Sequence, residues 1–413
     1  MIPSIMSART APRGRSFRRT DTIGDPLRRR IDRSRSPRDG GLANTGTTKP
    51  RRRAARPRAR AAEPKSSDVI PMTAMVAPGC DTSPSPLPGA APSLMHADQY
   101  NPAQQEVVTL LGAPRGERPE FDAGLREELR DHLEARLEPL ITPIESNDFD
   151  GDNLFLSKYM LSQVLGCERK FLADRSEPFA WSPAIARGTV MHKAIELSVH
   201  WRGENSPLVL VDEAITSLQN ADKSIGDYLA TCSESERAEL RAGTSAAMTQ
   251  FLECFPSLKT AWRPATESPI RAELHGGLIV LSGKPDLTLG QPDGTVAGKV
   301  IIDFKTGGFS PAHREDLRFY ALLEALRILP PRLLATYYLD QGRIHSEEVT
   351  EDLLLSASER VIDGAHRYVE LACGTRQPTV TPGPSCRWCP VQPDCDEGTE
   401  YLDGAYEDGS EDW

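Results

Sequence analysis

The spacing of apolar residues changes near residue 268, and this change constrains the fold more than any other feature of the 413-residue sequence. Before it, apolar residues recur at helical spacing, as the leucines between Leu125 and Leu137 do, so this first half of the body is expected to be wholly helical. From Ser268 to Lys305, short apolar runs are separated by glycines and by Pro292-Asp293-Gly294, which predicts an antiparallel meander. The chain is therefore expected to combine helices and strands in an α/β fold.

The same spacing rules give the expected elements on both sides of this boundary. One helix should begin at Pro183 with Ser182 as its cap, and another should have Asn101 as its cap and Pro102 in its first turn. Further helices are expected over residues 125–143, 157–171, 208–219, 235–254, 311–329 and 351–371. Strands are expected over residues 270–274, 278–281, 287–289, 300–304, 336–339 and 343–349.

Charge is divided unevenly along the chain. Residues 1–65 hold 19 basic and 5 acidic side chains, whereas residues 66–413 hold 30 and 54. The first segment is broken by Pro, Gly and Ser and lacks apolar periodicity, so residues 1–95 are expected to be disordered. This segment could bind nucleic acid, act as a transit-like peptide, or precede a true start at Met72, Met75 or Met95.

Composition excludes several classes of protein. No run approaches the roughly 18 apolar residues of a membrane span, and no apolar segment follows the N-terminal arginines. The protein is therefore expected to be cytoplasmic, without membrane contact. Eight cysteines are too few for a disulfide scaffold in so long a chain, so they indicate metal binding or catalysis instead.

Two of the expected strands carry carboxylates at their ends. Asp286 follows the strand at 278–281, and the strand at 300–304 carries Asp303 just before Lys305. Because side chains alternate along a strand, Asp303 and Lys305 should point to the same face. Two carboxylates and a lysine on one face form a site for Mg²⁺ or Mn²⁺, in which the lysine orients a water or offsets phosphate charge. For an isolated D-x-K triplet the alternative is an exposed hairpin with alternating charges.

The complete set, Gly283-Lys-Pro-Asp286 followed by Asp303-Phe-Lys305-Thr-Gly307, resembles the PD-(D/E)XK nuclease superfamily, and in particular its RecB-like branch. The resemblance implies a restriction-endonuclease-like core, in which helices flank a mixed central sheet, with a helical N-terminal part and a C-terminal iron–sulfur segment. It also implies metal-dependent hydrolysis of phosphodiester bonds in DNA. Asp286, Asp303 and the carbonyl of Phe304 would hold the metal, and Lys305 would orient the attacking water.

The resemblance extends to both sides of these strands. Upstream, the stretch from Arg187 to Glu196 is similar to the G-x-x-x-H motif, which implies that His192 is a further metal ligand. Glu196 could orient His192 or simply pair with a lysine. Downstream, the stretch from Asp316 to Tyr320 stands in place of the Q-x-x-x-Y motif, with Asp316 replacing the glutamine. Tyr320 is therefore expected to belong to the catalytic group.

Four of the cysteines have a spacing that suits a metal centre. Cys386, Cys389 and Cys395 form a C-x₂-C-x₅-C pattern, and Cys167 stands before the nuclease core. This division resembles the iron–sulfur staple of AddB-type nucleases and of CRISPR-associated adaptation exonucleases, which implies a [4Fe–4S] cluster. A Zn²⁺ ion bound by four cysteines is the chemical alternative. The remaining cysteines (Cys80, Cys232, Cys254 and Cys373) are expected to be linker or core thiols.

The sequence has no ATP site of its own. The segment from Gly277 to Lys284 comes nearest to a phosphate loop, but its glycine spacing is wrong and Pro285 stands where Ser or Thr is needed. Because many proteins that it resembles work beside a helicase, a separate UvrD-like helicase is the suggested partner. The body is acidic, so DNA contacts are expected from local arginine and lysine clusters and from the metal.

Taken together, the residues and the resemblance predict a metal-dependent DNA nuclease, an exonuclease acting on ends or single strands in repair or recombination. The expected organisation is a helical lead-in at 96–150, a nuclease domain at 151–400 and an acidic tail at 401–413. The alternative is a non-cleaving DNA-binding iron–sulfur scaffold that partners a helicase. A complete set of acids and lysine argues against it, because a protein released from catalysis does not need them.

Overall fold

The structure, a computed structural model, describes residues 100–407 apart from 147, 204 and 222–223. All of these residues belong to the second of two units, which spans residues 89–413. The expected disordered segment at 1–95, with Cys80, and the end of the expected acidic tail at 408–413 lie outside the described residues. Within the described part of the chain, no helix is long and apolar enough to cross a membrane.

The described strands form two sheets. In the first, β4 lies between β1, which is parallel to it, and β3, which is antiparallel. In the second, the order is β2-β5-β6-β7-β8, and every neighbouring pair is antiparallel except β6 and β7. The strands are β1 Leu154–Leu156, β2 Ala265–Thr266, β3 Ile270–Leu274, β4 Ile279–Gly283, β5 Leu287–Leu289, β6 Val300–Lys305, β7 Leu333–Tyr338 and β8 Arg343–Glu348.

Helices occupy most of the remaining described chain. They are α1 Pro102–Leu111, α2 Leu125–Leu137, α3 Ile141–Glu145, α4 Lys158–Val164, α5 Glu168–Ser176, α6 Pro183–His200, α7 Pro207–Gln219, α8 Ser224–Thr231, α9 Glu234–Cys254, α10 Ala312–Arg327, α11 Glu351–Ala372 and α12 Asp396–Glu407. The expected caps of α1 and α6 are confirmed, because Asn101 accepts the N–H of Gln104 and Ser182 accepts that of Ile185.

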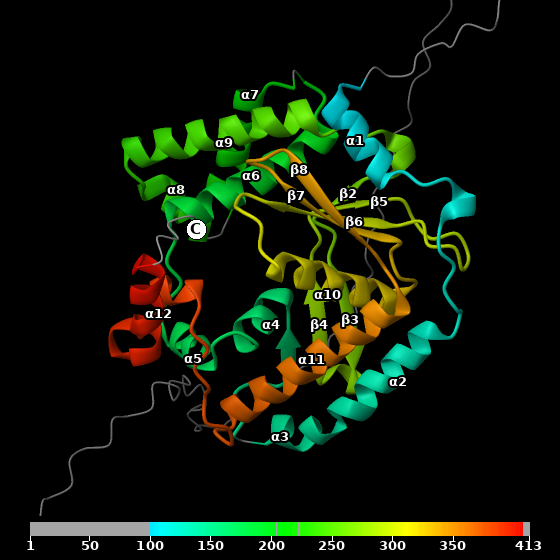
Figure 1. The fold of residues 1–413 in the computed structure, drawn as a ribbon. Helices are drawn as coiled ribbons and strands as arrows, with labels where there is room; N and C mark the ends of the chain where they lie inside the picture. Colours follow the sequence, from blue (N-terminus) through cyan, green and yellow to red (C-terminus); the bar gives the residue numbers. More distant parts are fainter. Residues whose placement is uncertain (1–99, 147, 204, 222–223, 408–413) are drawn as a thin grey trace, which may run out of the picture. The chain divides into compact units, whose positions relative to one another are not determined.

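The five-stranded sheet lies between two hydrophobic cores. Ile302 and Phe304 of β6 face one core, which α6, α7 and α9 complete. Ile301 faces the other core, where α10 separates the five-stranded sheet from the three-stranded sheet, α2 and α11. Figure 1 shows these helices on opposite sides of β6 and β7. This alternation along β6 leaves Asp303 on the α10 face.

The expected antiparallel meander is only partly correct. Its apolar runs do form strands β3, β4, β5 and β6, but β4 belongs to the first sheet and β5 to the second. The chain leaves β4 after Gly283 through Lys284-Pro285-Asp286, and Pro285 has no N–H with which to continue a ladder. The carboxylate of Asp286 is therefore placed where the chain crosses between sheets.

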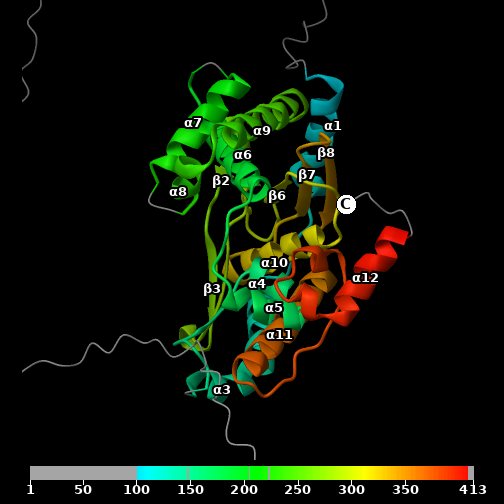
Figure 2. The ribbon, with the colours of Figure 1, turned by 90° about the vertical axis from the view of Figure 1, so that its left-hand side faces the viewer.

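The first half of the body is not wholly helical, because β1 pairs with β4 across more than a hundred residues. The helix expected at 157–171 is two helices, α4 and α5, which are separated at Gly166-Cys167. Helix α8 was not expected, and β7 begins three residues before the expected strand at 336. Figures 1 and 2 show that the break between α4 and α5 leaves α5 beside the C-terminal segment that carries α12.

Candidate active site

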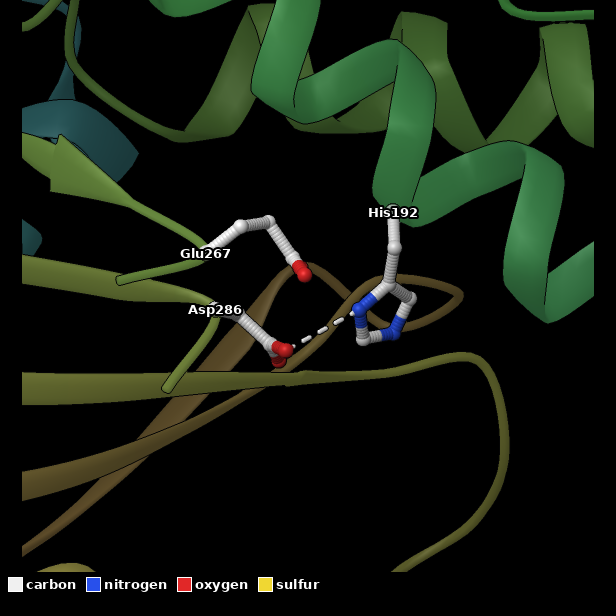
Figure 3. Close-up of side chains that lie close together, drawn as sticks. All are labelled: His192, Glu267 and Asp286. Atoms are coloured by element: carbon white, nitrogen blue, oxygen red, sulfur yellow. Dashed lines mark ion pairs between the residues drawn. The ribbon is translucent and has the colours of Figure 1, made fainter. Parts of the chain in front are cut away.

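Three side chains from different parts of the fold bring their donor atoms to one place. His192 lies on α6, Glu267 directly follows β2, and Asp286 directly precedes β5. One donor atom from each lies within 4.8 Å of the other two, and all three side chains are partly exposed. Figure 3 shows the imidazole and the two carboxylates pointing toward one another.

Backbone contacts fix the two carboxylates. One oxygen of Asp286 lies 3.2 Å from His192 Nδ1, and the other accepts the backbone N–H of Phe304 at 2.7 Å. Glu267 has a left-handed φ of 49°, and its N–H donates to the carbonyl of Asp286 at 3.2 Å. A left-handed backbone costs energy for any residue but glycine, so the surrounding contacts determine where this side chain points. Glu267 also forms an ion pair with Lys284.

Asp303 is 1% exposed and is held by two lysines. Lys158 Nζ lies 2.8 Å from Oδ1, and Lys305 Nζ lies 2.8 Å from Oδ2. Burial opposes ionisation of this carboxyl, but the two lysines hold the pKa of Asp303 at about 2. Each oxygen of this buried carboxylate therefore has one ammonium as its partner, and a cation bound by Asp303 would share the carboxylate with the two lysines.

A second carboxylate, Asp316 on α10, joins the two lysines. Its Oδ2 lies 3.1 Å from Lys305 Nζ and 3.8 Å from Lys158 Nζ. Burial alone would lower the pKa of Lys158, but the carboxylates, Asp303 first, raise it above its ordinary value. The residue that replaces the motif glutamine therefore fixes the position of Lys305.

Tyr320 lies behind this cluster and is buried. Its hydroxyl donates to the carbonyl of Lys284 at 3.0 Å, and its ring centroid lies 4.9 Å from Lys158 Nζ. The ring packs so closely on Gly283 that a Cβ at this position would lie 2.4 Å from it. Burial raises the pKa of Tyr320 to about 12. Tyr320 thus connects α10 to the motif glycine, and its catalytic role stays a prediction.

The donor set fits a divalent cation. Burial would lower the pKa of His192, but the surrounding carboxylates, Asp286 first, raise it above its ordinary value. Asp303 and Glu267 add to this effect, so three negative charges surround one imidazole. Carboxylate oxygens with one imidazole are ligands that Mn²⁺ and Mg²⁺ accept, and a bound ion would offset the excess negative charge.

The four cysteines of the expected cluster also come together. Cys167, Cys386, Cys389 and Cys395 line one small cavity of about 10 Å³, here named the cysteine cavity. Cys386 and Cys395 are buried, and a Cβ on Gly398 would lie 3.6 and 3.3 Å from their sulfurs. The backbone N–H of Gly383 donates to Cys386 Sγ at 3.4 Å. Four thiols with a backbone N–H donor form a chemically suitable site for zinc or an iron–sulfur cluster.

Comparison with known families identifies the chain. The model of the PD-(D/E)XK nuclease superfamily matches residues 156–396, which include every residue of the candidate site. The chain belongs to the PD-(D/E)XK nuclease superfamily. Nucleases of this superfamily hydrolyse phosphodiester bonds with divalent metals, so the chain is a nuclease, and its described residues include a possible metal site formed by His192, Glu267 and Asp286.

Two solved structures are similar to this nuclease. One is a candidate exonuclease from Eubacterium rectale, with 11% sequence identity and a TM-score of 0.35. The matched region covers 62% of this chain and 91% of the exonuclease chain. Another is the protein SSO0001, with 14% sequence identity and a TM-score of 0.22. The matched region covers 58% of this chain and 96% of the SSO0001 chain. No curated protein matches the sequence.

The nuclease contains two candidate residues that the sequence did not indicate, Glu267 and Lys158. Glu267 takes a place beside His192 and Asp286 that had been expected for Asp303, because Lys158 and Lys305 hold the Asp303 oxygens. Lys158 directly follows Ser157, the N-cap of α4, and no local sequence pattern marks this position as part of an active site. The only sequence signal for Glu267 is its place just before the predicted strands.

Glu196 does not contact His192 in the described structure. Lys193 Nζ lies 3.0 Å from a carboxylate oxygen of Glu196, so the second of the two expected alternatives, a simple ion pair on α6, is the one observed.

Proposed function

We propose that this nuclease is a RecB-like DNA exonuclease that acts on ends or single strands in repair or recombination. The observation that carries the proposal is the meeting of His192 and Asp286 beside an Asp303–Lys305 pair on β6. The G-x-x-x-H stretch before these strands and the tyrosine after them support the RecB-like branch rather than another branch of the superfamily.

In the proposed mechanism His192, Asp286, Asp303 and the carbonyl of Phe304 would hold Mg²⁺ or Mn²⁺, and Glu267 adds a fourth side chain. The ion would supply positive charge for the scissile phosphate and for the attacking water. Phe304 donates its N–H to Asp286, which keeps this carboxylate in register with β6. The carboxylates of Asp286, directly before β5, and of Asp303, on β6, would thus reach the ion from adjacent strands of one sheet.

Lys305 orients the attacking water. Asp303 and Asp316 hold its ammonium at 2.8 and 3.1 Å, so little side-chain freedom remains to be lost when water or phosphate arrives. The ammonium donates a hydrogen bond to the water oxygen or to a phosphate oxygen. The water oxygen forms the new bond to phosphorus and loses a proton to solvent, while the phosphorus–oxygen bond on the opposite side breaks and the leaving oxygen takes up a proton from solvent.

Lys158 is a second ammonium in the same site. It is only 25% exposed, and its charge neutralises Asp303 before the site is loaded. A cation bound by Asp303 must therefore share this carboxylate with Lys158. When substrate enters, the same ammonium can move to offset the charge of the phosphate.

The cysteine cavity is proposed to hold a [4Fe–4S] cluster. In a zinc site with Zn–S bonds of about 2.3 Å the four sulfurs lie about 3.8 Å apart. A cuboidal cluster holds its four thiolates farther apart than this, so the sulfur spacing of the metal-loaded protein distinguishes the cluster from zinc. The cluster would connect α5 to the C-terminal segment and close a loop of more than 200 residues.

The remaining expectations complete the proposal. Residues 151–400 would form the catalytic domain, the protein would act in the cytoplasm, and a separate UvrD-like helicase would supply unwound DNA. The non-cleaving scaffold is disfavoured because the buried Asp303 and its lysines would be costly to retain without catalysis.

End dependence is tested with two substrates in Mg²⁺ or Mn²⁺. An end-labelled linear DNA should be degraded from its termini, while a circular single-stranded DNA of the same sequence should resist. Equal rates of cleavage of the two would refute exonuclease action and leave a nuclease that cuts internally.

A further inference from the structure

A cavity of about 470 Å³ lies outside the candidate active site. Its wall comes from α1 and the residues after it, from residues 255–263, and from the connection between β5 and β6. Asp286 precedes β5, whereas Gly290, which lines the cavity, follows it. At about 3.3 Å per residue the cavity begins about 13 Å from the active site, at the other end of the same strand.

Arg118 and Arg332 line this space, which is named the arginine cavity below. Arg332 is only 9% exposed, and its Nε has no hydrogen-bond partner in the described structure. One of its terminal nitrogens donates to the carbonyl of Leu111. Arg118 donates its Nε to the carbonyl of Ala113 at 3.0 Å, which leaves its terminal nitrogens available.

The charge of the arginine cavity is not balanced by the protein. Asp293 is the only acidic residue among the described residues that line it, and Arg115 already pairs with Asp293 at 2.8 Å. Arg118, Arg263 and Arg332 form no ion pair with any described carboxylate. Burial lowers the pKa of Arg332 and the charge of Arg118 lowers it further, while the charge of Glu348 only partly offsets these effects. A buried guanidinium without a carboxylate in an ion pair is costly, so an anion from outside would stabilise this arrangement.

The rest of the wall is apolar and partly aromatic. Phe255, Trp262 and Leu289 contribute apolar side chains to this part of the wall. Trp262 also lies under the ammonium of Lys259, 5.7 Å from its ring centroid. A ligand that satisfies both parts of the wall has an oxyanion and a flat, weakly polar ring.

We infer that the arginine cavity binds a phosphorylated nucleoside, with its phosphate on Arg332 and Arg118 and its base on the wall that contains Trp262. Arginine suits this task because its fixed fork of donors matches two phosphate oxygens. The phosphate comes either from a free mononucleotide or from the end of a DNA strand. The inference concerns binding and stands whether or not the active site cleaves DNA.

Binding is measured by calorimetry and thermal shift in EDTA, which removes divalent ions from the active site. The probes are dAMP, inorganic phosphate, and a 5′-phosphorylated oligonucleotide beside its unphosphorylated form. We expect dAMP to bind at least about tenfold more tightly than phosphate, since the base adds apolar contact. If the source is a strand end, the phosphorylated oligonucleotide should bind more tightly than both dAMP and the unphosphorylated form.

Arg332→Gln separates a ligand-binding arginine from a structural one. The amide can keep the bond to Leu111 while the unpaired charge is removed, so without ligand this variant should melt no lower than the native protein. It should lose at least about tenfold in affinity for dAMP, whereas the exposed control Arg343→Gln should lose none.

Two results would overturn the inference. One is binding of dAMP and of the phosphorylated oligonucleotide by Arg332→Gln with native affinity. The other is the absence of any binding by the native protein at millimolar ligand. If Arg332→Gln does not fold, Arg118→Gln provides the same comparison, because Arg118 is partly exposed and contributes a single described hydrogen bond.

Discussion

Glu168 follows Cys167 of the cysteine cavity and is fully buried, yet it carries a charge because its pKa is lowered. Its two oxygens accept Arg376 Nε at 3.0 and 3.1 Å, and one also accepts the backbone N–H of Thr379 at 2.9 Å. Arg367 adds an ion pair at 3.6 Å. These contacts fasten the start of α5 to the segment that leads to the other three cysteines.

Replacing Glu168 with Gln keeps its volume but removes the charge and turns one acceptor into a donor. Breaking a fully buried pair costs about 3–5 kcal/mol. Here Arg376 and Arg367 are 31% and 29% exposed, so water can partly solvate them after the change. We therefore expect a loss of about 2–3 kcal/mol in the free energy of unfolding, or about 3–5 °C in Tm for a unit of this size.

The pH dependence gives a second check. Burial would raise the pKa of Glu168, but Thr379 and Arg376 hold it below its usual value of 4.5. Because the folded pKa is the lower one, the stabilisation is complete above about pH 4.5 and is lost as the pH falls through the folded pKa. The difference between native protein and Glu168→Gln should therefore shrink in acid.

Urea unfolding, followed at pH 7 and again below pH 4.5, measures both effects. Glu370→Gln is the matched control, because Glu370 pairs with the same Arg376 but is 41% exposed, and it should cost less than about 1 kcal/mol. If Glu168→Gln costs no more than this control at pH 7, the reasoning about the buried carboxylate is wrong.

Three further predictions concern the site and its supports. Gly283→Ala should cost about 1–3 kcal/mol in urea unfolding, because its Cβ would lie 2.4 Å from the ring of Tyr320; native stability would contradict this packing. Lys158→Met removes a cation that competes for Asp303, so it should lower the half-saturating Mn²⁺ concentration about tenfold. Turnover should fall in the same variant. Unchanged Mn²⁺ affinity in calorimetry would exclude competition. In anaerobically purified protein, Cys395→Ser should abolish the binding of iron and sulfide and the broad absorbance near roughly 400 nm. Cys254→Ser is the control and should behave like the native protein. Colourless native protein containing one zinc would refute the cluster.

Local rules predicted the parts of this fold that depend on local structure. The cap of α6 follows from Ser182-Pro183, and the alternation along β6 follows from the period of a strand. As predicted, Asp303 and Lys305 share one face while Ile302 and Phe304 enter the core on the other. These features placed the motif residues on the correct elements.

The remaining features depend on contacts between distant residues. Lys158 lies 145 residues before Asp303, and the parallel pairing of β1 with β4 and the packing of α4 on α10 bring it to the site. Glu267 enters the site because β2 pairs with β5, which places residue 267 next to Asp286, and no local pattern indicates this pairing. Neither a lysine after a helix cap nor a glutamate before a strand differs locally from an ordinary surface residue.

The central claim is that Lys305 and its carboxylates perform metal-dependent cleavage, and it is tested by the rate of hydrolysis of linear DNA in Mg²⁺ or Mn²⁺. Native protein and Lys193→Ala, which removes a lysine of α6 paired only with Glu196 in the described contacts, should cleave at similar rates. Lys305→Ala should cleave at least about a hundredfold more slowly while still binding DNA. Equal rates for Lys305→Ala and native protein, or an equal lack of activity in both with DNA still bound, would contradict the account.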